Sequence, residues 1–270
     1  MEHFVWNIAP QLAQIGPFEI RYYGLLFACG FLVGYQIMQK IFIHEGRDPE
    51  DLSSLLTHLM LGTIIGARLG HCLFYEPAYY LSHPLQILMV WKGGLASHGG
   101  GIGVITAVFL YCRKHTDQPF LWLCDRIYIG LMFTGFCIRL GNFFNSEIVG
   151  LPSNASWAVI FERIDSIPRH PAQLYESAAY LVGFIFMCLL YLKNKEKTPQ
   201  GKLLGFGLIW TFTARFLLEF FKENQVAFEQ GMLLNMGQLL SIPYILLGVL
   251  LFTGVLQSAL GIPKLAKENR

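Results

Sequence analysis

Charged residues are scarce in this sequence of 270 residues: they make up 14% of the chain, against 54% hydrophobic residues. So low a charged fraction excludes an ordinary soluble domain, in which about 25% of the residues are charged. The apolar residues fall in blocks of about 18 to 25, the length that a helix needs to cross about 30 Å of hydrocarbon. The sequence therefore predicts an all-α integral membrane protein.

Several kinds of site have no signal in the sequence. The six cysteines stand singly in or beside apolar segments, and the eight histidines lack the spacing of metal ligands, so neither a disulfide framework nor a metal site is indicated. A net charge of +2 argues neither for nor against nucleic acid, but no basic stripe with interleaved aromatics appears, so nucleic acid is not expected as a partner. Met1 to Pro17 lack the pattern of a signal peptide, so we expect this segment to be retained.

About seven transmembrane helices are predicted. They lie near residues 18–42, 53–75, 94–112, 121–140, 174–192, 203–221 and 236–258. The longest interruption, residues 141–173, is rich in polar residues and prolines and is expected to form an ordered extracytoplasmic excursion between the fourth and fifth spans. No long polar linker, low-complexity tract or internal repeat divides the chain, so we expect one polytopic domain over residues 1–270.

The basic residues of the loops predict the orientation. One set of connections holds eleven of them: Lys40, Arg47, Arg113, Lys114, Lys193, Lys195, Lys197, Lys202, Lys264, Lys267 and Arg270. The other set holds four: Lys92, Arg163, Arg169 and Lys222. Because basic loops stay in the cytoplasm, the N-terminus is predicted to be extracytoplasmic and the C-terminus cytoplasmic.

Glycines recur every four residues in the first two spans. Gly62, Gly66 and Gly70 share one helix face, and Gly30 and Gly34 repeat the spacing. Such faces let helix backbones approach closely, and we favour packing over the alternative that a substrate passes along the smooth surface.

Charged side chains at membrane depth are costly and usually face a cavity, a partner or a task. Arg68, Arg139, Arg215 and Glu219 lie within or at the mouths of apolar segments, and together with His98 they indicate a polar pocket. Two converging arginines would form a strong phosphate clamp. The alternatives are snorkelling of each arginine to the interface and a simple pair between Arg215 and Glu219, four residues apart.

His98 precedes a run of glycines that would let a headgroup approach the imidazole, and histidine is the usual proton acceptor near neutral pH. A structural histidine at a helix start is the open alternative. Ser97 beside it does not indicate a serine protease, because neither a GxSx arrangement nor a late glycine-rich helix with a second histidine is present.

Four segments resemble the prolipoprotein diacylglyceryl transferase family. The segment at residues 139–150, RLGNFFNSEIVG, is similar to the family signature. Three further matches occur in the order in which the family has them: RYYGL at 21–25, SHGG at 97–100 and RHPAQLYE at 169–176. The resemblance covers nearly the whole chain. Ile138 stands where members commonly have glycine, and Thr211 where they often have tyrosine, which leaves open what replaces that hydroxyl.

The resemblance implies a bacterial inner-membrane enzyme without metal or organic cofactor. Such an enzyme transfers the diacylglyceryl group of phosphatidylglycerol to the lipobox cysteine of a prolipoprotein, forms a thioether and releases glycerol 1-phosphate. The positions that match the family's functional residues are Tyr23, His98, Arg139, Asn142, Glu147, Gly150, Arg215 and Glu219. We expect His98, Arg139 and Arg215 to be catalytic, and Tyr23, Arg139, Asn142, Glu147, Gly150, Arg215 and Glu219 to bind phosphatidylglycerol.

Three other classes of membrane protein are less well supported. A transporter or channel would favour inverted repeats and broken helices, which the sequence lacks. A phosphatidyl-alcohol transferase would need an aspartate-rich metal motif, whereas Asp125 is the only aspartate near a span. A non-catalytic lipid-binding scaffold is the third alternative.

Overall fold

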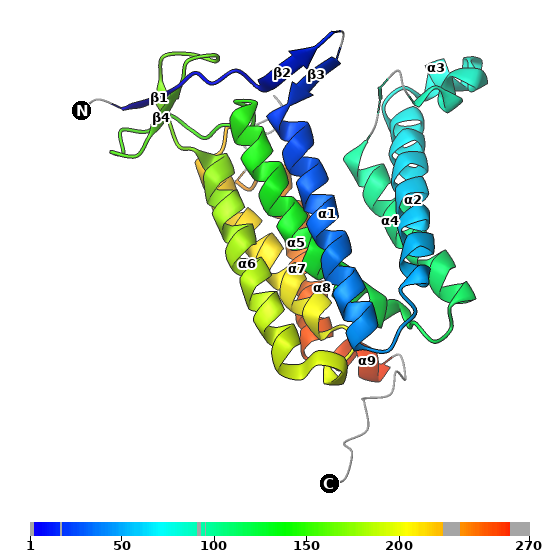
Figure 1. Cartoon of the computed structure of the whole chain (residues 1–270). Coiled ribbons are helices and arrows are strands. Elements are labelled where there is room, and N and C mark those ends of the chain that lie inside the picture. The colour runs from blue at the N-terminus through cyan, green and yellow to red at the C-terminus, as the bar shows by residue number, and fades with distance from the viewer. Residues whose placement is uncertain (1–2, 17, 91–92, 95, 224–232, 260–270) are drawn as a thin grey trace. The chain divides into compact units, whose positions relative to one another are not determined.

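The computed structural model describes residues 3–16, 18–90, 93–94, 96–223 and 233–259. The chain forms two compact units, one made of residues 1–38 and 125–270 and the other of residues 39–124. Both are built mainly from helices (Figure 1).

Long helices dominate the first unit. Those wholly or mainly within it are α1 (Tyr22–His44), α5 (Phe120–Phe144), α6 (Ala172–Asn194), α7 (Lys202–Leu218), α8 (Met236–Phe252) and the short α9 (Val255–Ala259). The 3-10 turn η3 (Lys195–Lys197) follows α6, and η4 (Glu219–Phe221) follows α7.

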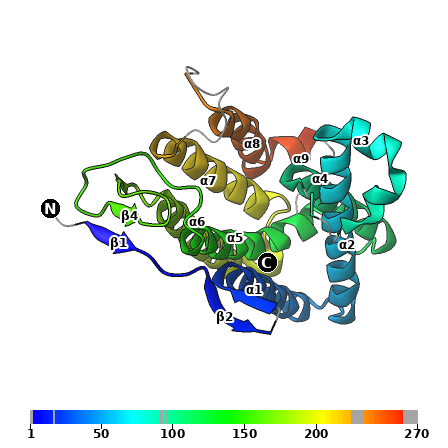
Figure 2. The same cartoon turned by 90° about the horizontal axis from the view of Figure 1, so that it is seen from above.

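Close contacts join these helices into a bundle in the series α1, α5, α6, α7, α8 (Figure 2). Gly34 of α1 faces Gly130 of α5, where an added Cβ would lie 3.6 Å from the Gly130 Cα. The Ser177 hydroxyl of α6 donates to the Phe136 carbonyl of α5 at 3.1 Å. The α7 helix is tied to α6 by the Trp210 indole, and it approaches α8 closely at Gly205.

Polar side chains accept hydrogen bonds from the first backbone N–H groups of two of these helices. Asp125 of α5 accepts hydrogen bonds from the backbone N–H groups of Gly201 and Leu204, both at 2.7 Å, and so satisfies donors at the start of α7. Asn235 and Gln238 form a capping box at the start of α8. The lone aspartate near a predicted span therefore has a structural task.

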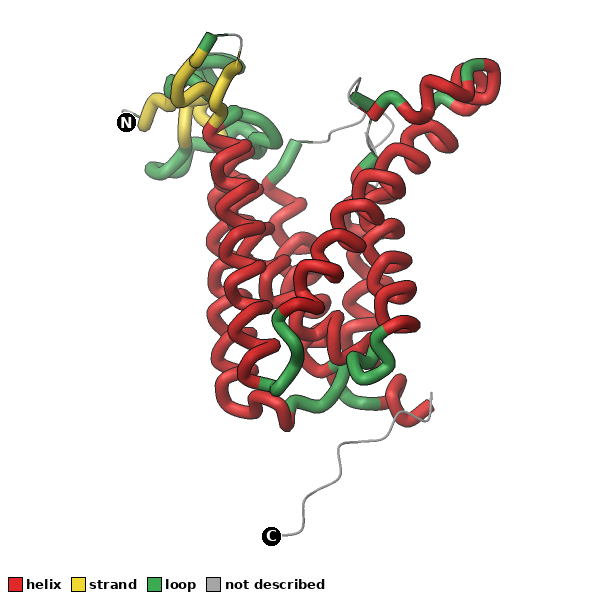
Figure 3. Tube along the Cα trace, turned by 45° about the vertical axis from the view of Figure 1, so that its right-hand side comes forward, coloured by secondary structure: helices red, strands yellow, loops and turns green. Residues whose placement is uncertain are grey.

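Short strands lie at one end of the bundle (Figure 3), the end where α1 begins and α5 ends (Figure 1). A parallel pair joins β1 (Phe4–Trp6) to β4 (Val159–Phe161), and β5 (Pro168–Arg169) extends the sheet antiparallel to β4. A separate hairpin pairs β2 (Gln11–Ile15) with β3 (Phe18–Arg21). The sequence analysis did not predict these strands, because runs of two to five residues carry little periodicity.

The second unit consists of α2 (Glu50–Phe74), α3 (Pro77–Ser82), the 3-10 turn η1 (Pro84–Leu88) and α4 (Ser97–Lys114). Its two long helices pack through glycine. An added Cβ on Gly62 would lie 2.6 Å from the Gly103 carbonyl oxygen, and one on Gly70 would lie 2.8 Å from the Gly99 Cα. The predicted role of the Gly62, Gly66 and Gly70 face in close helix packing is confirmed.

The predicted fold class, an all-α membrane protein, is confirmed. Among the described residues, five helical segments are long and apolar enough to cross a membrane: Tyr22–His44, Glu50–Phe74, Phe120–Phe144, Ala172–Lys197 and Lys202–Phe221. The two other predicted spans coincide with α4, of 18 residues, and with the apolar α8, of 17 residues.

Candidate functional site

Arg139, near the end of α5, is the centre of a cluster of polar side chains. Its Nη1 donates to the Asn142 Oδ1 at 3.4 Å, one helical turn further on. Its Nε lies 3.1 Å from the Glu176 Oε2 on α6. The Arg139 side chain is 14% exposed and that of Glu176 is fully buried. A guanidinium fixed on two sides still has N–H donors to offer to an anion.

Asn142 belongs to α5, which ends at Phe144 and is therefore four residues longer than the predicted span. The excursion accordingly begins after Phe144 and not at residue 141. The physical reason is a partner distant in sequence: Phe143 and Phe144 pack against Trp6 of β1, with ring centroids 4.3 and 5.4 Å apart. Burial of these rings stabilises the last turn of the helix.

Glu147 ties the first residues of the excursion back to the helix. Its Oε1 accepts from the Asn142 Nδ2 at 2.7 Å and from the Asn145 Nδ2 at 3.1 Å. Its backbone carbonyl accepts from the Gln173 Nε2 of α6 at 2.7 Å. Two neighbours, Ser146 and Ile148, have φ near +55°, which is uncommon for a serine and strained for a β-branched isoleucine. The Glu147 contacts hold this turn in place.

A second group of charges continues from Glu176. Lys222 Nζ lies 3.6 Å from the Glu176 Oε1 and donates to the Glu219 Oε2 at 2.9 Å. The Lys222 side chain is 2% exposed and that of Glu219 is 8% exposed. The Glu219 carboxylate also lies against Gly237 of α8, where an added Cβ would be 2.8 Å from the Glu219 Cδ. The ion pair found for Glu219 is thus with Lys222, and not with Arg215, which the sequence left open as an alternative.

Arg215 and Tyr23 lie at the edges of the same cluster. Tyr180, one turn after Glu176 on α6, has a hydroxyl on which Arg139 and Arg215 both act electrostatically. Tyr23, at the start of α1, lies over Gly141 of α5, where an added Cβ would be 2.7 Å from the Tyr23 Cδ2. The charges of Glu147 and Arg139 both act on the Tyr23 hydroxyl.

Most of the predicted site residues therefore come together in the first unit. They are Tyr23, Arg139, Asn142, Glu147, Arg215 and Glu219.

Gly150 lies where three segments of backbone meet. Its N–H donates to the His170 carbonyl at 3.0 Å, and the next N–H, of Leu151, donates to the Phe221 carbonyl at 2.9 Å. An added Cβ on Gly150 would lie 2.5 Å from the His170 carbonyl oxygen and 2.6 Å from that of Phe221. The requirement for glycine here is steric, because no side chain fits between these strands of backbone.

Arg169 fastens the excursion beside Gly150. Its guanidinium donates to Asp165, with Nη2 2.6 Å from the Oδ2, and also pairs with Glu223. The hydrogen bond from Arg169 lowers the pKa of the Asp165 carboxyl. Asp165 further accepts from the Ile167 N–H at 2.9 Å, so its carboxylate organises the loop before β5.

The second unit contains His98 and Arg68. Ser97 and His98 are the first residues of α4, and their side chains lie outside the described residues, so the role of His98 stays a prediction. Arg68 is buried and donates to the carbonyls of Gln86, Ile87, Gly93 and Gly94. Its guanidinium also lies over the Tyr80 ring, 5.0 Å from the centroid. These contacts give Arg68 a structural role within its own unit, and its place in the polar pocket stays a prediction.

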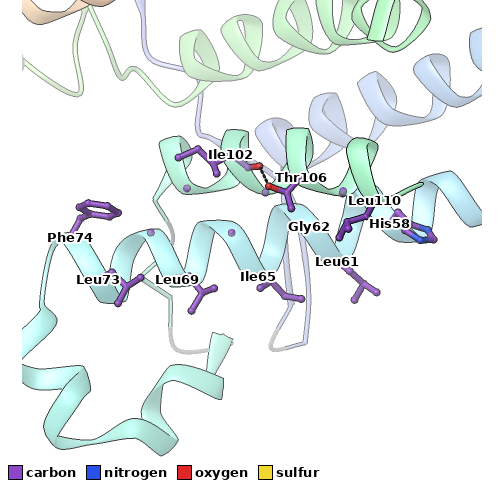
Figure 4. A pocket seen from close by; sticks show the side chains of 15 residues that line it. His58, Leu61, Gly62, Ile65, Leu69, Leu73, Phe74, Ile102, Thr106 and Leu110 are labelled. Carbon is purple, nitrogen blue, oxygen red and sulfur yellow. Dashed lines mark hydrogen bonds between the residues drawn. The ribbon is translucent and has the colours of Figure 1, made fainter. Parts of the chain in front are cut away.

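An apolar pocket of about 460 Å³ runs along α2 and α4 beside their glycine contact (Figure 4). Its lining includes Leu61, Ile65, Leu69 and Leu73 of α2 and Ile102 of α4. The Thr106 hydroxyl in the wall donates to the Ile102 carbonyl at 2.9 Å, so it has no need of a ligand. The lining is apolar apart from the side chains of His58 and Thr106.

Thr211, which replaces the tyrosine common in the resembling family, has two internal partners. The Tyr128 hydroxyl of α5 donates to the Thr211 Oγ1 at 3.2 Å, and the Thr211 hydroxyl contacts the Met132 sulfur at 3.1 Å. A tyrosine hydroxyl thus reaches this position from the neighbouring helix.

Glu176, Tyr180 and Lys222 are cluster residues that the sequence analysis did not select. Glu176 ends the segment RHPAQLYE and lies within the fifth predicted span, so the cost of a charge at membrane depth was a signal that could have identified it. Lys222 counted only as a basic loop residue. Tyr180 had no signal, since one tyrosine in an apolar helix is ordinary.

Comparison with known proteins supports the resemblance in the sequence. A family model described as prolipoprotein diacylglyceryl transferase matches residues 10–253. A phosphatidylglycerol–prolipoprotein diacylglyceryl transferase from Tolumonas auensis is 53% identical over 246 residues, which cover 91% of this chain and 95% of the relative. Relatives with the same name from Chloroherpeton thalassium and Bacteroides fragilis are 49% and 44% identical, covering 96% and 90% of this chain and 97% and 92% of their own lengths.

Proposed function

The chain belongs to the prolipoprotein diacylglyceryl transferase family, and we propose that the Arg139 cluster is the phospholipid site of that reaction. The enzyme transfers the diacylglyceryl group of phosphatidylglycerol to a cysteine thiol of a prolipoprotein, the first step of lipoprotein maturation. A carbon–sulfur bond forms as the bond between the diacylglyceryl carbon and a phosphate oxygen breaks. The departing oxygen keeps the electron pair, and glycerol 1-phosphate leaves.

Arg139 and Arg215 bind the phosphate and stabilise the negative charge that grows on it as this bond breaks. The observation that carries the proposal is the anchoring of Arg139 by Asn142 and Glu176. A guanidinium held by buried partners presents its remaining donors in a fixed fork, which matches two phosphate oxygens. Its charge is the opposite of that of the phosphate, and the low local dielectric strengthens the attraction.

The incoming thiol needs a base, because a cysteine with a pKa of about 8.5 is mostly protonated at neutral pH. We assign this role to His98, whose imidazole takes the thiol proton as the sulfur attacks. The alternative role for His98 is to orient the headgroup. A His98→Asn variant with full lipid binding and no transfer supports the base and argues against a non-catalytic scaffold.

The other predicted residues position the substrate or the arginines. Tyr23 offers its hydroxyl to the headgroup. Asn142 is held by Glu147 and in turn accepts from Arg139, so both residues orient the clamp. Glu219 accepts a hydrogen bond from Lys222 and so holds the ammonium beside Glu176. Gly150 lets the backbone of the excursion pass close to the segment after α7.

We further propose seven spans in the bacterial inner membrane, with the N-terminus extracytoplasmic. The prolipoprotein then presents its lipobox cysteine at the outer half of the membrane. The excess of lysines around Lys195 and Lys197 supports a cytoplasmic loop at that point. A reporter enzyme fused after Lys197 is expected to report the cytoplasm, and an extracytoplasmic signal would overturn this orientation.

The activity is tested with purified protein, labelled phosphatidylglycerol and two lipobox peptides that differ only in a cysteine-to-serine replacement. Label should enter only the cysteine peptide, with release of glycerol phosphate in equal amount. Absence of transfer by folded protein that still binds phosphatidylglycerol would contradict the proposed function.

A further inference from the structure

Lys222 is a buried cation placed between two carboxylates. Its Nζ lies 2.9 Å from the Glu219 Oε2 and 3.6 Å from the Glu176 Oε1, and all three side chains are at least nine-tenths buried. Lysine is almost never fully buried unless it is paired, so this position requires a carboxylate partner.

The Lys222 backbone is held as firmly as its side chain. Its N–H donates to the Glu219 carbonyl at 3.2 Å, and Lys222 forms an isolated antiparallel bridge with Gly150. The ammonium therefore approaches the two carboxylates from a fixed point at the end of η4.

Glu176 is shared between Lys222 and Arg139. The Arg139 Nε lies 3.1 Å from the Oε2 of Glu176, while Lys222 lies on the side of its Oε1. The charge of Glu219 also acts on Arg139. The carboxylates of Glu176 and Glu219 thus compete with any bound anion for the positive charge of Arg139. Lys222 forms ion pairs with both carboxylates and so reduces this competition.

We propose that Lys222 is a positioning residue that keeps the charge of Arg139 and Arg215 available to the substrate phosphate. The charged residues of the cluster are Arg139, Arg215, Lys222, Glu147, Glu176 and Glu219, three positive and three negative, so Lys222 completes a neutral set. Without Lys222 the three carboxylates outnumber the two arginines, and the net negative charge opposes the binding of an anion. The inference rests on the proposed phosphate site.

The test compares the kcat and KM of transfer, with phosphatidylglycerol as the varied substrate, in three variants. Lys222→Met should lower kcat/KM about a hundredfold, whereas Lys222→Arg, which keeps the charge, should stay within about tenfold of the parent. The decisive variant combines Lys222→Met with Glu176→Gln. It removes one charge of each sign, so it should recover activity to within about threefold of Glu176→Gln alone.

Lys193→Met is the matched control, since Lys193 is exposed at the end of α6 and should be as active as the parent. A Lys222→Met variant with parental kcat/KM would overturn the role of Lys222. So would a double variant no more active than Lys222→Met, with a lowered melting temperature in both, because that result marks a purely structural ion pair. The phosphate site itself fails separately, if Arg139→Lys is fully active.

Discussion

The Arg139 guanidinium of α5 and the Glu176 carboxylate of α6 form an ion pair, with the Nε 3.1 Å from the Oε2, in which the acid is fully buried. A buried carboxylate has one strong reason to be ionised, and that is a cation in contact. The pair therefore fixes the direction of the guanidinium that we assign to the phosphate.

Replacing Glu176 with glutamine should weaken the orientation of the Arg139 guanidinium, although the side chain at position 176 keeps its shape. Glutamine lacks the negative charge that attracts the Arg139 guanidinium. We expect kcat/KM for transfer to fall about tenfold, which corresponds to a loss of about 1.4 kcal/mol of transition-state stabilisation. Glu162→Gln, in the exposed part of the excursion, is the control and should retain parental activity. Parental kcat/KM in Glu176→Gln would contradict an orienting role.

Arg68→Leu should loosen the segment before α4 and leave the Arg139 cluster intact. The change leaves the carbonyls of Gln86, Ile87, Gly93 and Gly94 without their donor. Each of these hydrogen bonds has a charged donor, and such a bond contributes about 1.5–3 kcal/mol.

Limited proteolysis read out by mass spectrometry should detect faster cleavage between residues 84 and 96 in Arg68→Leu. Arg113→Leu, at the exposed end of α4, should be cleaved like the parent. An unchanged cleavage rate at this segment in Arg68→Leu would show that Arg68 does not hold it.

Gly150→Ala should destabilise the contact between the excursion and the end of α7. The new methyl group would lie 2.5 to 2.7 Å from atoms of His170 and Phe221, and overpacking of this kind costs about 1–3 kcal/mol. The melting temperature and the transfer activity should fall together. Gly34→Ala is the control, because its Cβ would have an ordinary contact of 3.6 Å. Lost activity with an unchanged melting temperature would instead indicate that Gly150 contacts the substrate.

Acid should loosen the loop before β5. The pKa of Asp165 is lowered by its hydrogen bond with Arg169, so the ionised form is favoured in the folded state. This stabilisation is complete above the ordinary carboxyl pKa of 3.8 and is lost as the pH falls through the lowered value.

Hydrogen exchange at residues 165–170, corrected for its intrinsic pH dependence, should therefore accelerate below about pH 4. The Asp165→Asn variant should exchange fast at neutral pH and lack this acid step, and Glu162→Gln should behave like the parent. The same acid step in Asp165→Asn would assign it to another group.

Hydropathy alone located the helices, because each predicted span overlaps one of the long helices of the structure. The arginine at the end of α5 was also identifiable, since a charge at membrane depth is costly wherever it occurs. Its partners were not. Glu176 and Lys222 lie 37 and 83 residues beyond Arg139 in the chain, and only the packing of α5 against α6 and η4 brings them together. Arg68 shows the reverse case, in which a buried charge binds backbone carbonyls of its own unit.

The central claim is that the geometry of the Arg139 guanidinium, and not its charge alone, stabilises the departing phosphate. Arg139→Lys keeps the charge and removes the fork, so the measurement that tests the claim most directly is kcat/KM of diacylglyceryl transfer in this variant. Arg113→Lys at the exposed end of α4 serves as its control. We predict a loss of about a hundredfold with an unchanged melting temperature. Activity close to that of the parent would contradict the phosphate clamp.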